Sequence, residues 1–371
     1  MRILIFNWKD LAHPAAGGAE VFTEEVARAL VSRGHEVTLF CAAVAARPER
    51  ELVGGVQIVR RGGRTSVYRA ARRFWSEQEP HRYDVVVDEI NTRPFLTPRW
   101  VRDTPIVALI HQLAREIWSF ELPFPVSVLG RYVLEPFWLR AYRDVPALTV
   151  SQSSADSLAR YHGWRDVTVV PEGHTPHPVP DVPKETTPTV VFLGRLVAMK
   201  RPEHALAAFE QLPDAQLWVI GDGPLLDRLR ASAPPRVLFL GRLRRDELRA
   251  RLARAHVLVA TSVREGWGLN VSEAAACGTP SIGYAVPGLL DAVPASGGAL
   301  VEPTPQALAD ALREYFAGTL ELKPRVSTVP WAEVAELVER RLAQALTDHK
   351  SQAAPHSGAV GGGVHRRERG E

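Results

Sequence analysis

The sequence predicts an α/β protein made of two doubly wound domains that face each other across a cleft. Its 371 residues exceed one ordinary core and suit two domains of about 150 residues each. Short apolar runs alternate with amphipathic segments, which is typical of a parallel sheet covered by helices on both faces. The alternation stops at the proline-rich residues 176–183 and then restarts, which places the domains at residues 1–174 and 175–330. A proline-rich surface loop inside one domain is the alternative interpretation.

The first half of the chain is expected to form a parallel sheet. A helix at residues 19–32 carries an apolar stripe and ends before Gly34. A second helix is expected at residues 67–78. The expected strands are residues 3–7, 37–40, 56–59, 85–87, 106–110, 148–150 and 167–170.

The second half repeats this architecture without repeating the sequence. Its expected strands are residues 190–193, 217–220, 237–240, 257–260 and 281–283, and its helices are 201–211, 224–231, 246–255 and 269–277. A final amphipathic helix is expected from residue 331 to about residue 346. Residues 331–348 are assigned to the first domain. The remainder, residues 349–371, is rich in glycine, serine and charge and is predicted to be disordered.

Composition narrows the class of protein. The chain is 46% hydrophobic and 23% charged, and it lacks an apolar stretch of about 18 residues that would predict a transmembrane helix. The N-terminus reads as a buried strand rather than a signal peptide, so we expect a cytoplasmic protein. Residues 349–371 contribute two units of the net charge of +3, so the rest of the chain is close to neutral. The net charge is therefore only weak evidence for nucleic-acid binding. Two cysteines, Cys41 and Cys277, provide neither a disulfide framework nor a CxxC zinc site.

Two strand-ending loops carry residues suited to anions. Ligands of such sheets bind beyond the carboxyl ends of the strands. The first loop ends in Gly17 and Gly18 at a helix start, where backbone N–H groups favour an anion. It lacks the Gly-x-Gly-x-x-Gly pattern of nicotinamide dinucleotide sites. The loop after residues 190–193 carries Arg195 and Lys200, which suit a diphosphate. A glycine turn and two solvated cations are the alternative interpretations.

The most specific loop follows the strand at 257–260. Glu265 precedes a helix and Glu273 lies inside it, with Gly266, Trp267 and Gly268 between strand and helix. The helix start offers N–H groups to a phosphate, and the carboxylates can accept hydrogen bonds from sugar hydroxyls. Ordinary surface charge is the alternative, but glycines at a helix start lower stability and so argue for a function.

The segment from Glu265 to Pro280 resembles the E-x7-E signature of glycosyltransferase family 4, the retaining transferases of GT-B fold. Four other motifs occur in the family's order, so the resemblance covers about residues 1–346. They are Gly17-Gly18-Ala19-Glu20, Val170-Pro171-Glu172-Gly173, Gly194-Arg195-Leu196 with Lys200, and Val219-Ile220-Gly221-Asp222-Gly223-Pro224. The resemblance implies two Rossmann-like domains of the GT-B fold, with the C-terminal helix packing back on the N-terminal domain.

The resemblance also implies roles for individual residues. Four residues would be catalytic. Arg195 and Lys200 would bind the donor diphosphate, Glu265 would bind the sugar hydroxyls, and His111 would lie near the reacting sugar. A polar residue capping a strand is the alternative for His111, and the correspondence of Asp291 with an acidic residue of the family is loose. The donor would otherwise be held by Glu273 on the ribose, by the segment Gly266, Trp267, Gly268, Leu269 and Asn270, and by Gly17 and Gly18 across the cleft.

The chain departs from the family pattern at two positions. Gln112 follows His111 where many relatives have aspartate, and Glu172 replaces the commoner asparagine. Both departures are consistent with a different donor or acceptor. The chain contains no Asp-x-Asp, so we expect neither a metal nor a cofactor beyond the nucleotide-sugar co-substrate.

The expected function is therefore retaining transfer of a sugar from a UDP-, GDP- or related nucleotide sugar to a hydroxyl acceptor. The acceptor would be a glycolipid, a cell-envelope polysaccharide precursor or a small metabolite. A sugar-nucleotide epimerase of the same fold and a non-catalytic nucleotide- or glycan-binding module are the alternatives. Nucleic-acid binding is a further alternative, but the chain lacks a recognised module for it.

Two segments of the first domain are candidates for the acceptor side. The segment from Arg60 to Trp75 has six arginines, no acidic residue and interleaved aromatic residues, which favours peripheral contact with an anionic membrane, such as the inner face of the cell membrane. The segment from Glu116 to Tyr142 is rich in tryptophan and phenylalanine and could form an acceptor channel or a membrane-facing edge. A solvated charged face and a core hairpin of helices are the alternatives.

Overall fold

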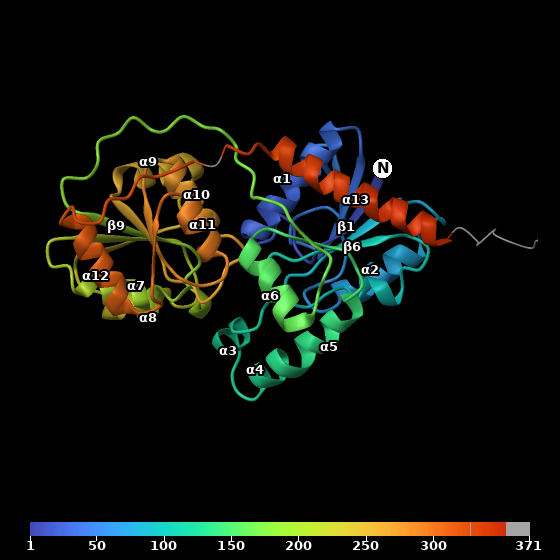
Figure 1. Ribbon diagram of the computed structural model, residues 1–371, viewed down its shortest axis with the longest axis horizontal. Helices are drawn as coiled ribbons and strands as arrows, with labels where there is room; N and C mark the ends of the chain where they lie inside the picture. Colours follow the sequence, from blue (N-terminus) through green and yellow to red (C-terminus); the bar gives the residue numbers. More distant parts are fainter. Residues whose placement is uncertain (327, 354–371) are drawn as a thin grey trace, which may run out of the picture.

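Two β-sheets, one in each half of the chain, are each flanked by helices and lie side by side. The computed structural model describes residues 1–326 and 328–353. A long, irregular linker crosses between the sheets, and the chain later returns to the first of them (Figure 1). Among the described helices, none is long and apolar enough to cross a membrane.

The first sheet has eight strands in the order β3-β4-β2-β1-β5-β6-β7-β8. Seven of them are parallel, but β3 pairs antiparallel with β4, so the expectation of a wholly parallel sheet was wrong at this edge. The missed strand has the mixed sequence Arg-Glu-Leu-Val and is only half covered. The strands are β1 (Arg2–Phe6), β2 (Glu36–Cys41), β3 (Arg50–Val53), β4 (Val56–Arg60), β5 (Val85–Glu89), β6 (Ile106–Leu109), β7 (Ala147–Thr149) and β8 (Val167–Val169).

Helices cover both faces of this sheet. The helix α6 was not expected from the sequence, although Ser151 caps its first turn by accepting from Ser154 N. The elements are α1 (Gly18–Ser32), α2 (Val67–Ser76), η1 (Thr97–Arg99), α3 (Ile117–Glu121), α4 (Val126–Leu129), η2 (Gly130–Leu134), α5 (Glu135–Leu139), η3 (Arg140–Tyr142) and α6 (Gln152–His162).

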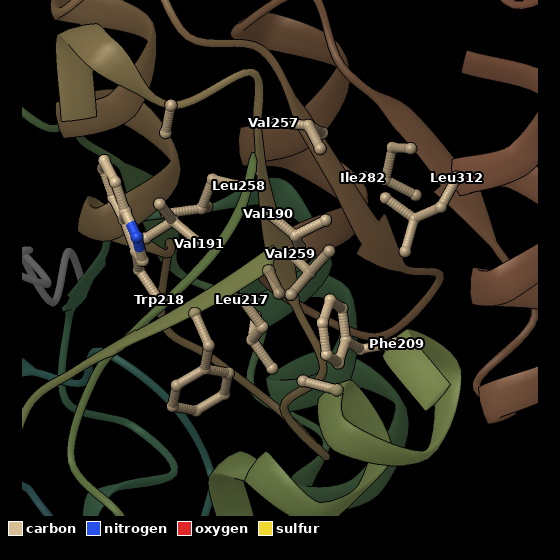
Figure 2. Close-up of a cluster of buried hydrophobic side chains, with 14 of the residues drawn as sticks. Val190, Val191, Phe209, Leu217, Trp218, Val257, Leu258, Val259, Ile282 and Leu312 are labelled. Carbon is tan, nitrogen blue, oxygen red and sulfur yellow. The ribbon is translucent and has the colours of Figure 1, made fainter. Parts of the chain in front are cut away.

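The second sheet is parallel and has the order β11-β10-β9-β12-β13-β14. Its central strands consist mostly of buried apolar residues, as expected for strands covered on both faces (Figure 2). The strands are β9 (Thr189–Leu193), β10 (Gln216–Ile220), β11 (Val237–Gly241), β12 (Val257–Ala260), β13 (Ser281–Tyr284) and β14 (Ala299–Val301).

The helices of the second domain include two that the sequence analysis left unassigned, α11 and α12. Thr304 caps α12 by accepting from Ala307 N at 3.2 Å, and Pro305 occupies its first turn. The elements are η4 (Ala198–Lys200), α7 (Pro202–Glu210), α8 (Leu226–Ser232), α9 (Arg245–Arg254), α10 (Leu269–Ala276), α11 (Leu289–Ala295) and α12 (Pro305–Phe316).

The last helix, α13 (Trp331–Ala353), lies on the first domain and packs along α1 (Figure 1). Val334, Ala335 and Leu342 are fully buried in the same core as Ile3 and Phe22. The expected return of the C-terminal helix is confirmed. The expectation of disorder from residue 349 was wrong up to Ala353, because the helix continues to that residue; residues 354–371 lie outside the described part of the chain.

The strand orders explain where a site can form. In the first sheet the chain runs from β1 outward to β4 and then resumes on the other side of β1 with β5. In the second sheet it runs from β9 outward to β11 and resumes beside β9 with β12. The loops after β1 and β5, and after β9 and β12, therefore diverge and leave a crevice at each of these switch points.

Candidate functional site

A pocket of about 510 Å³ lies between the two domains, at the carboxyl ends of both sheets. Loops that follow β1, β6, β9 and β12 supply most of its walls. All twelve residues predicted for the site line this one pocket. They are Gly17, Gly18, His111, Arg195, Lys200, Glu265, Gly266, Trp267, Gly268, Leu269, Asn270 and Glu273.

The second domain contributes the wall that carries the two cationic side chains. The Lys200 ammonium forms an ion pair with the Glu265 carboxylate, which also accepts a hydrogen bond from the Ser262 hydroxyl. Glu265 is 8% exposed, and its backbone N–H donates to Pro287 O at 3.0 Å. Arg195 is exposed on the same wall. This wall, here called the donor wall, therefore holds one paired cation and one solvated cation.

The start of α10 completes the donor wall. Gly268 precedes the helix with a φ of 115°, a left-handed conformation that favours glycine. Asn270 Nδ2 donates to Leu193 O at 2.9 Å and so ties the helix start to the end of β9. The Trp267 indole donates to Ser272 Oγ at 2.9 Å, and Glu273 stays exposed one turn further along. The first turn of α10 therefore presents its N–H groups beside Arg195 and Lys200.

The two domains touch across the pocket at two glycines. A Cβ at Gly266 would lie 3.0 Å from His111 O, and one at Gly18 would lie 2.9 Å from a Leu269 methyl. Both distances are shorter than ordinary carbon contacts, so any larger residue would push the domains apart. These contacts explain why glycine occupies both positions.

The first domain contributes a wall that holds His111 among three carboxylates, here called the acceptor wall. His111 Nε2 lies 3.3 Å from Glu89 Oε1, and the other Glu89 oxygen accepts from the Thr23 hydroxyl at 2.6 Å. Burial lowers the pKa of His111, but the hydrogen bond to Glu89 and the charges of Glu89, Glu172 and Glu20 outweigh it, and the net pKa is raised.

Glu20 links the glycine loop to this cluster. Its Oε2 accepts from Gly17 N at 2.6 Å, and its Oε1 lies 3.1 Å from the Lys9 ammonium. Burial raises the pKa of Glu20, although Lys9 opposes the shift. Glu20 thus caps the start of α1 through the Gly17 N–H and holds the loop that faces the donor wall.

Glu172 is the least compensated carboxyl of the acceptor wall. It is 6% exposed, it lines the pocket, and no residue in the described part of the chain forms a hydrogen bond with its Oε2. Burial raises its pKa to about 7, and the charge of His111 opposes this rise. Glu172 and His111 are therefore buried residues of one pocket whose charged forms stabilise each other.

Sequence reasoning missed Lys9 and Glu89 as parts of this site. The expected strand ended at residue 87, whereas β5 extends to Glu89 and so carries two carboxylates to the carboxyl end of the sheet. The first of them, Asp88, is fully buried and accepts from Thr97 N and Phe95 N at 3.2 and 3.3 Å, which is a structural role. An acidic pair at the end of an apolar run was the available signal for Glu89.

Two contacts outside the pocket join the domains. Asp291, the loose correspondence of the sequence analysis, lies outside the pocket and accepts from Gln152 N at 3.0 Å and Ser153 N at 3.2 Å at the start of α6. Arg264, which the sequence analysis did not single out, is 3% exposed and donates to Glu116 Oε2 at 3.0 Å. Both residues come from the second domain and fix its position against the first.

The two segments proposed for the acceptor side have different surroundings. In the segment from Arg60 to Trp75, Arg60 is buried in ion pairs with Asp10 and Glu51, and Phe74 is buried in the core. Phe74 is turned into the core, whereas Tyr68 and Trp75 are half-buried against it, so contact of this segment with a membrane stays a prediction. The segment from Glu116 to Tyr142, in contrast, exposes much of its apolar surface.

The described residues contain no group of three or more His, Cys, Asp and Glu side chains arranged to hold a metal ion. The donor wall offers cations and helix N–H groups, and the acceptor wall offers carboxyls and an imidazole.

Comparisons with known proteins match each half of the chain to a separate family model. Residues 16–176 match the family model Glycosyltransferase Family 4, and residues 177–327 match the model Glycosyl transferases group 1. The chain is 28% identical to a D-inositol 3-phosphate glycosyltransferase of Xylanimonas cellulosilytica over 81% of this chain and 84% of that protein.

Solved structures share the fold at lower identity. Sucrose-phosphate synthase from Thermosynechococcus elongatus matches with a TM-score of 0.72 and 20% identity, covering 95% of this chain and 97% of that one. The Anabaena protein HepE in complex with UDP-glucose matches with a TM-score of 0.65 and 17% identity, covering 95% and 99% of the two chains.

Proposed function

Because the chain belongs to glycosyltransferase family 4 and is a sugar-transferring enzyme of GT-B fold, we propose that the interdomain pocket is its active site. The proposed reaction moves a sugar from a nucleoside-diphosphate sugar to a hydroxyl acceptor with retention of anomeric configuration. The observation that carries this proposal is the meeting of Arg195, Lys200 and the start of α10 on one wall of a single pocket. The Anabaena protein HepE, whose structure holds UDP-glucose, has the same fold and supports a nucleotide-sugar donor.

Arg195, Lys200 and the first turn of α10 hold the donor diphosphate in this proposal. Breaking the bond between the sugar and the diphosphate leaves growing negative charge on the leaving phosphate. Cations and helix N–H groups already aimed at that position stabilise the transition state more than the ground state. We propose that they replace a metal ion, so that neither a metal nor another cofactor is needed.

Glu265 and Glu273 recognise hydroxyl groups of the donor. The Lys200 ion pair holds the Glu265 carboxylate at the pocket surface, where it can accept hydrogen bonds from the sugar. A bound diphosphate would give Lys200 a second anionic partner without removing the first. Glu273 lies one helical turn beyond Asn270 and is exposed, which suits a contact with the ribose. Gly17 and Gly18 face the donor from the opposite wall.

His111 is placed next to the reacting sugar in this proposal. It lies where Gly266 of the donor wall touches the first domain, so a sugar held by Glu265 would adjoin it. The acceptor hydroxyl attacks on the face from which the phosphate leaves, and the leaving phosphate takes up its proton. No protein nucleophile is assigned. Contact between the walls excludes water and so limits hydrolysis of the donor.

The acceptor is a hydroxyl compound bound by the first domain. The relative from Xylanimonas is named for an inositol phosphate, and a human relative with 23% identity is a phosphatidylinositol N-acetylglucosaminyltransferase subunit. We propose that this chain also uses a hydroxyl of a polar head group or a small metabolite. We further propose a cytoplasmic enzyme, which is consistent with Cys41 and Cys277 being separate buried thiols.

The test is donor binding and turnover with a panel of UDP-, GDP- and ADP-sugars. At least one should bind by calorimetry, and Arg195→Ala and Glu273→Ala should each reduce transfer on the order of 100-fold. Arg228→Ala and Glu210→Ala are matched controls, because both side chains are exposed on the same domain away from the pocket. Binding of none of the sugars, or near-normal transfer by both site variants, would sink the proposal.

A further inference from the structure

The segment α3 to α5, residues 117–139, exposes an unusual amount of apolar surface. Most of the large apolar side chains that the described part of the chain exposes belong to it. Phe124 is 81% exposed, Tyr132 61% and Phe137 57%. Monomeric proteins rarely expose so many large apolar residues together without an interaction partner. The full set is Phe120, Leu122, Phe124, Val126, Val128, Leu129, Tyr132, Val133 and Phe137, here called the apolar edge.

We propose that the apolar edge, with the arginines around it, is a docking surface for an anionic lipid bilayer. The inference concerns where the protein binds and does not depend on the reaction proposed above. It replaces the aromatic residues of α2, which pack against the core, with a different segment as the part that enters the membrane.

The inner side of this segment is specifically packed, so its exposed side chains are not a loosely folded core. Trp118 lies over Gly130, where any side chain would overlap the indole ring. The buried Glu135 carboxylate accepts from Ala114 N and Arg115 N, both at 2.8 Å, and from Trp118 Nε1 at 3.1 Å. The helices α4, η2 and α5 follow one another without a break. The segment therefore presents its apolar side outward on a firmly anchored base.

Positive charge surrounds the apolar edge. Arg140 and Arg143 are exposed directly after α5, and the Arg99 guanidinium lies 5.1 Å from the centre of the Phe137 ring. Of the two acidic residues in the segment, Glu135 is buried and only Glu121 is exposed, and the adjacent Glu116 pairs with Arg264. Two identical copies would bring these arginines together, which disfavours a dimer through this face. An anionic bilayer accepts both the apolar residues and the cations.

The basic face of α2 extends the same surface. The Arg93 guanidinium lies 4.2 Å from the centre of the Tyr68 ring of α2, and Arg93 and Arg99, which contacts Phe137 of α5, both lie on the connection between β5 and β6. Arg64, Arg69 and Arg72 are exposed. They cannot insert, but each can attract anionic head groups, typically by about 1 kcal/mol near the membrane surface. The expected contact of the segment from Arg60 to Trp75 is thus retained as an electrostatic one.

The docking surface adjoins the mouth of the active site. The helix α3 contacts η4, the turn that carries Lys200. Met199 N donates to Glu121 Oε1 at 3.4 Å, and Arg201 lies 5.0 Å from the centre of the Phe120 ring. Figure 1 shows α3 and α4 at one edge of the molecule, next to the junction of the two domains. A bilayer on the apolar edge would therefore lie beside the pocket.

The test is flotation of the full chain with lipid vesicles, without a donor. We expect binding to vesicles of phosphatidylglycerol and phosphatidylcholine at low salt, weaker binding in high salt, and little binding to phosphatidylcholine alone. The triple variant Phe124→Ser, Leu129→Ser and Val133→Ser should bind at least about tenfold more weakly, because three apolar side chains no longer enter the lipid. These positions are 81%, 48% and 53% exposed, so the fold should persist, as circular dichroism and Tm would verify.

The matched control is the triple variant Leu52→Ser, Val179→Ser and Leu238→Ser, whose positions are 70%, 55% and 44% exposed elsewhere on the protein. It should float like the unmodified chain. The proposal is overturned if the unmodified chain does not float at low salt, or if both triple variants lose binding equally. It is also overturned if neither the unmodified chain nor the first triple variant floats and light scattering shows a dimer that only the first triple variant disrupts. The partner of the apolar edge would then be a second copy of the chain.

Discussion

The two walls of the pocket are built in different ways. The donor wall comes from two loops that leave neighbouring strands, β9 and β12, at one switch point. The acceptor wall collects Glu20, Glu89, His111 and Glu172 from four places along the first domain. The residues of a wall made from short contiguous segments can be predicted from the sequence. A wall assembled from single residues appears only when the sheet brings them together.

The walls also differ in how their charges are balanced. On the donor wall, Lys200 and Glu265 neutralise each other and Arg195 faces solvent. On the acceptor wall, three buried carboxyls share one imidazole and one ammonium, those of His111 and Lys9. The donor wall therefore suits an anionic ligand, whereas the charge of the acceptor wall depends on pH. The predictions below test this difference in order of expected size.

The largest effect is expected from removing a cation of the donor wall. Lys200→Ala should lower kcat by about 100- to 1,000-fold, because the leaving phosphate loses a charge that stabilises it. It also leaves the nearly buried Glu265 carboxylate without its cation. Steady-state transfer by the variant, with the exposed Lys323→Ala as control, measures this. A kcat within threefold of normal, roughly 0.7 kcal/mol, would remove Lys200 from the chemistry.

The second prediction concerns protons on the acceptor wall. Because the pKa of Glu172 is raised to about 7, the folded protein holds a proton that the unfolded chain releases near pH 4.5. Stability from this group is present below its unfolded pKa and is lost as the pH rises through about 7. The raised pKa of His111 acts in the same direction. The unfolding free energy should therefore fall by up to about 3 kcal/mol between roughly pH 5 and pH 8.5.

Glu172→Gln should remove most of this fall, since an amide buries no charge. Urea unfolding of the two proteins at both pH values measures the difference. An identical pH dependence in the two proteins would show that Glu172 does not titrate in this range. A glutamate far from the pocket, such as the exposed Glu210, provides the control substitution to glutamine.

The third prediction concerns the contact between the walls. Gly266→Ala places a Cβ 3.0 Å from His111 O and should hold the walls apart, with kcat/KM for the donor lowered about tenfold. The melting temperature should change little, because each domain keeps its own core. Gly63→Ala is the control, since the nearest atom to its added Cβ is a serine hydroxyl at 3.9 Å. Equal activity of both variants would mean that the walls need not touch.

The smallest effect is expected at the contact outside the pocket. Asp291→Ala removes the acceptor for Gln152 N and Ser153 N, a capping interaction that contributes about 1 kcal/mol in other proteins. The domains should sample wider separations, and the KM for the donor should rise severalfold with kcat nearly unchanged. Small-angle scattering and steady-state kinetics measure the two effects. A large fall in kcat would instead place Asp291 in the chemistry.

The sequence was sufficient for the fold class and for the elements that hold the site. Buried strands such as β5, β9 and β12 read as apolar runs because both faces of each sheet are covered. Elements at the margins were missed. β3 pairs only at an edge and β14 has three half-buried residues, so neither shows a clear apolar pattern.

In the candidate site too, only features with a local sequence pattern could be predicted. Arg195, Lys200, Glu265 and the start of α10 were predictable because they stand in short segments whose chemistry is local. Their roles in catalysis remain proposals. The direction in which a helix turns its side chains was not predictable for α2, whose aromatic residues pack against the core although its composition suggested contact with a membrane surface. Which face is buried depends on the sheet beneath it, which a single helix sequence does not reveal.

The return of α13 to the first domain has a consequence for how the protein is made. β1 and α1 are synthesised before the second domain, but Val334, Ala335 and Leu342, which complete their core, are synthesised after it. The first domain must therefore wait, with part of its apolar face uncovered, until the second domain has been translated. A chain truncated before α13 would lack part of the core that supports its first sheet.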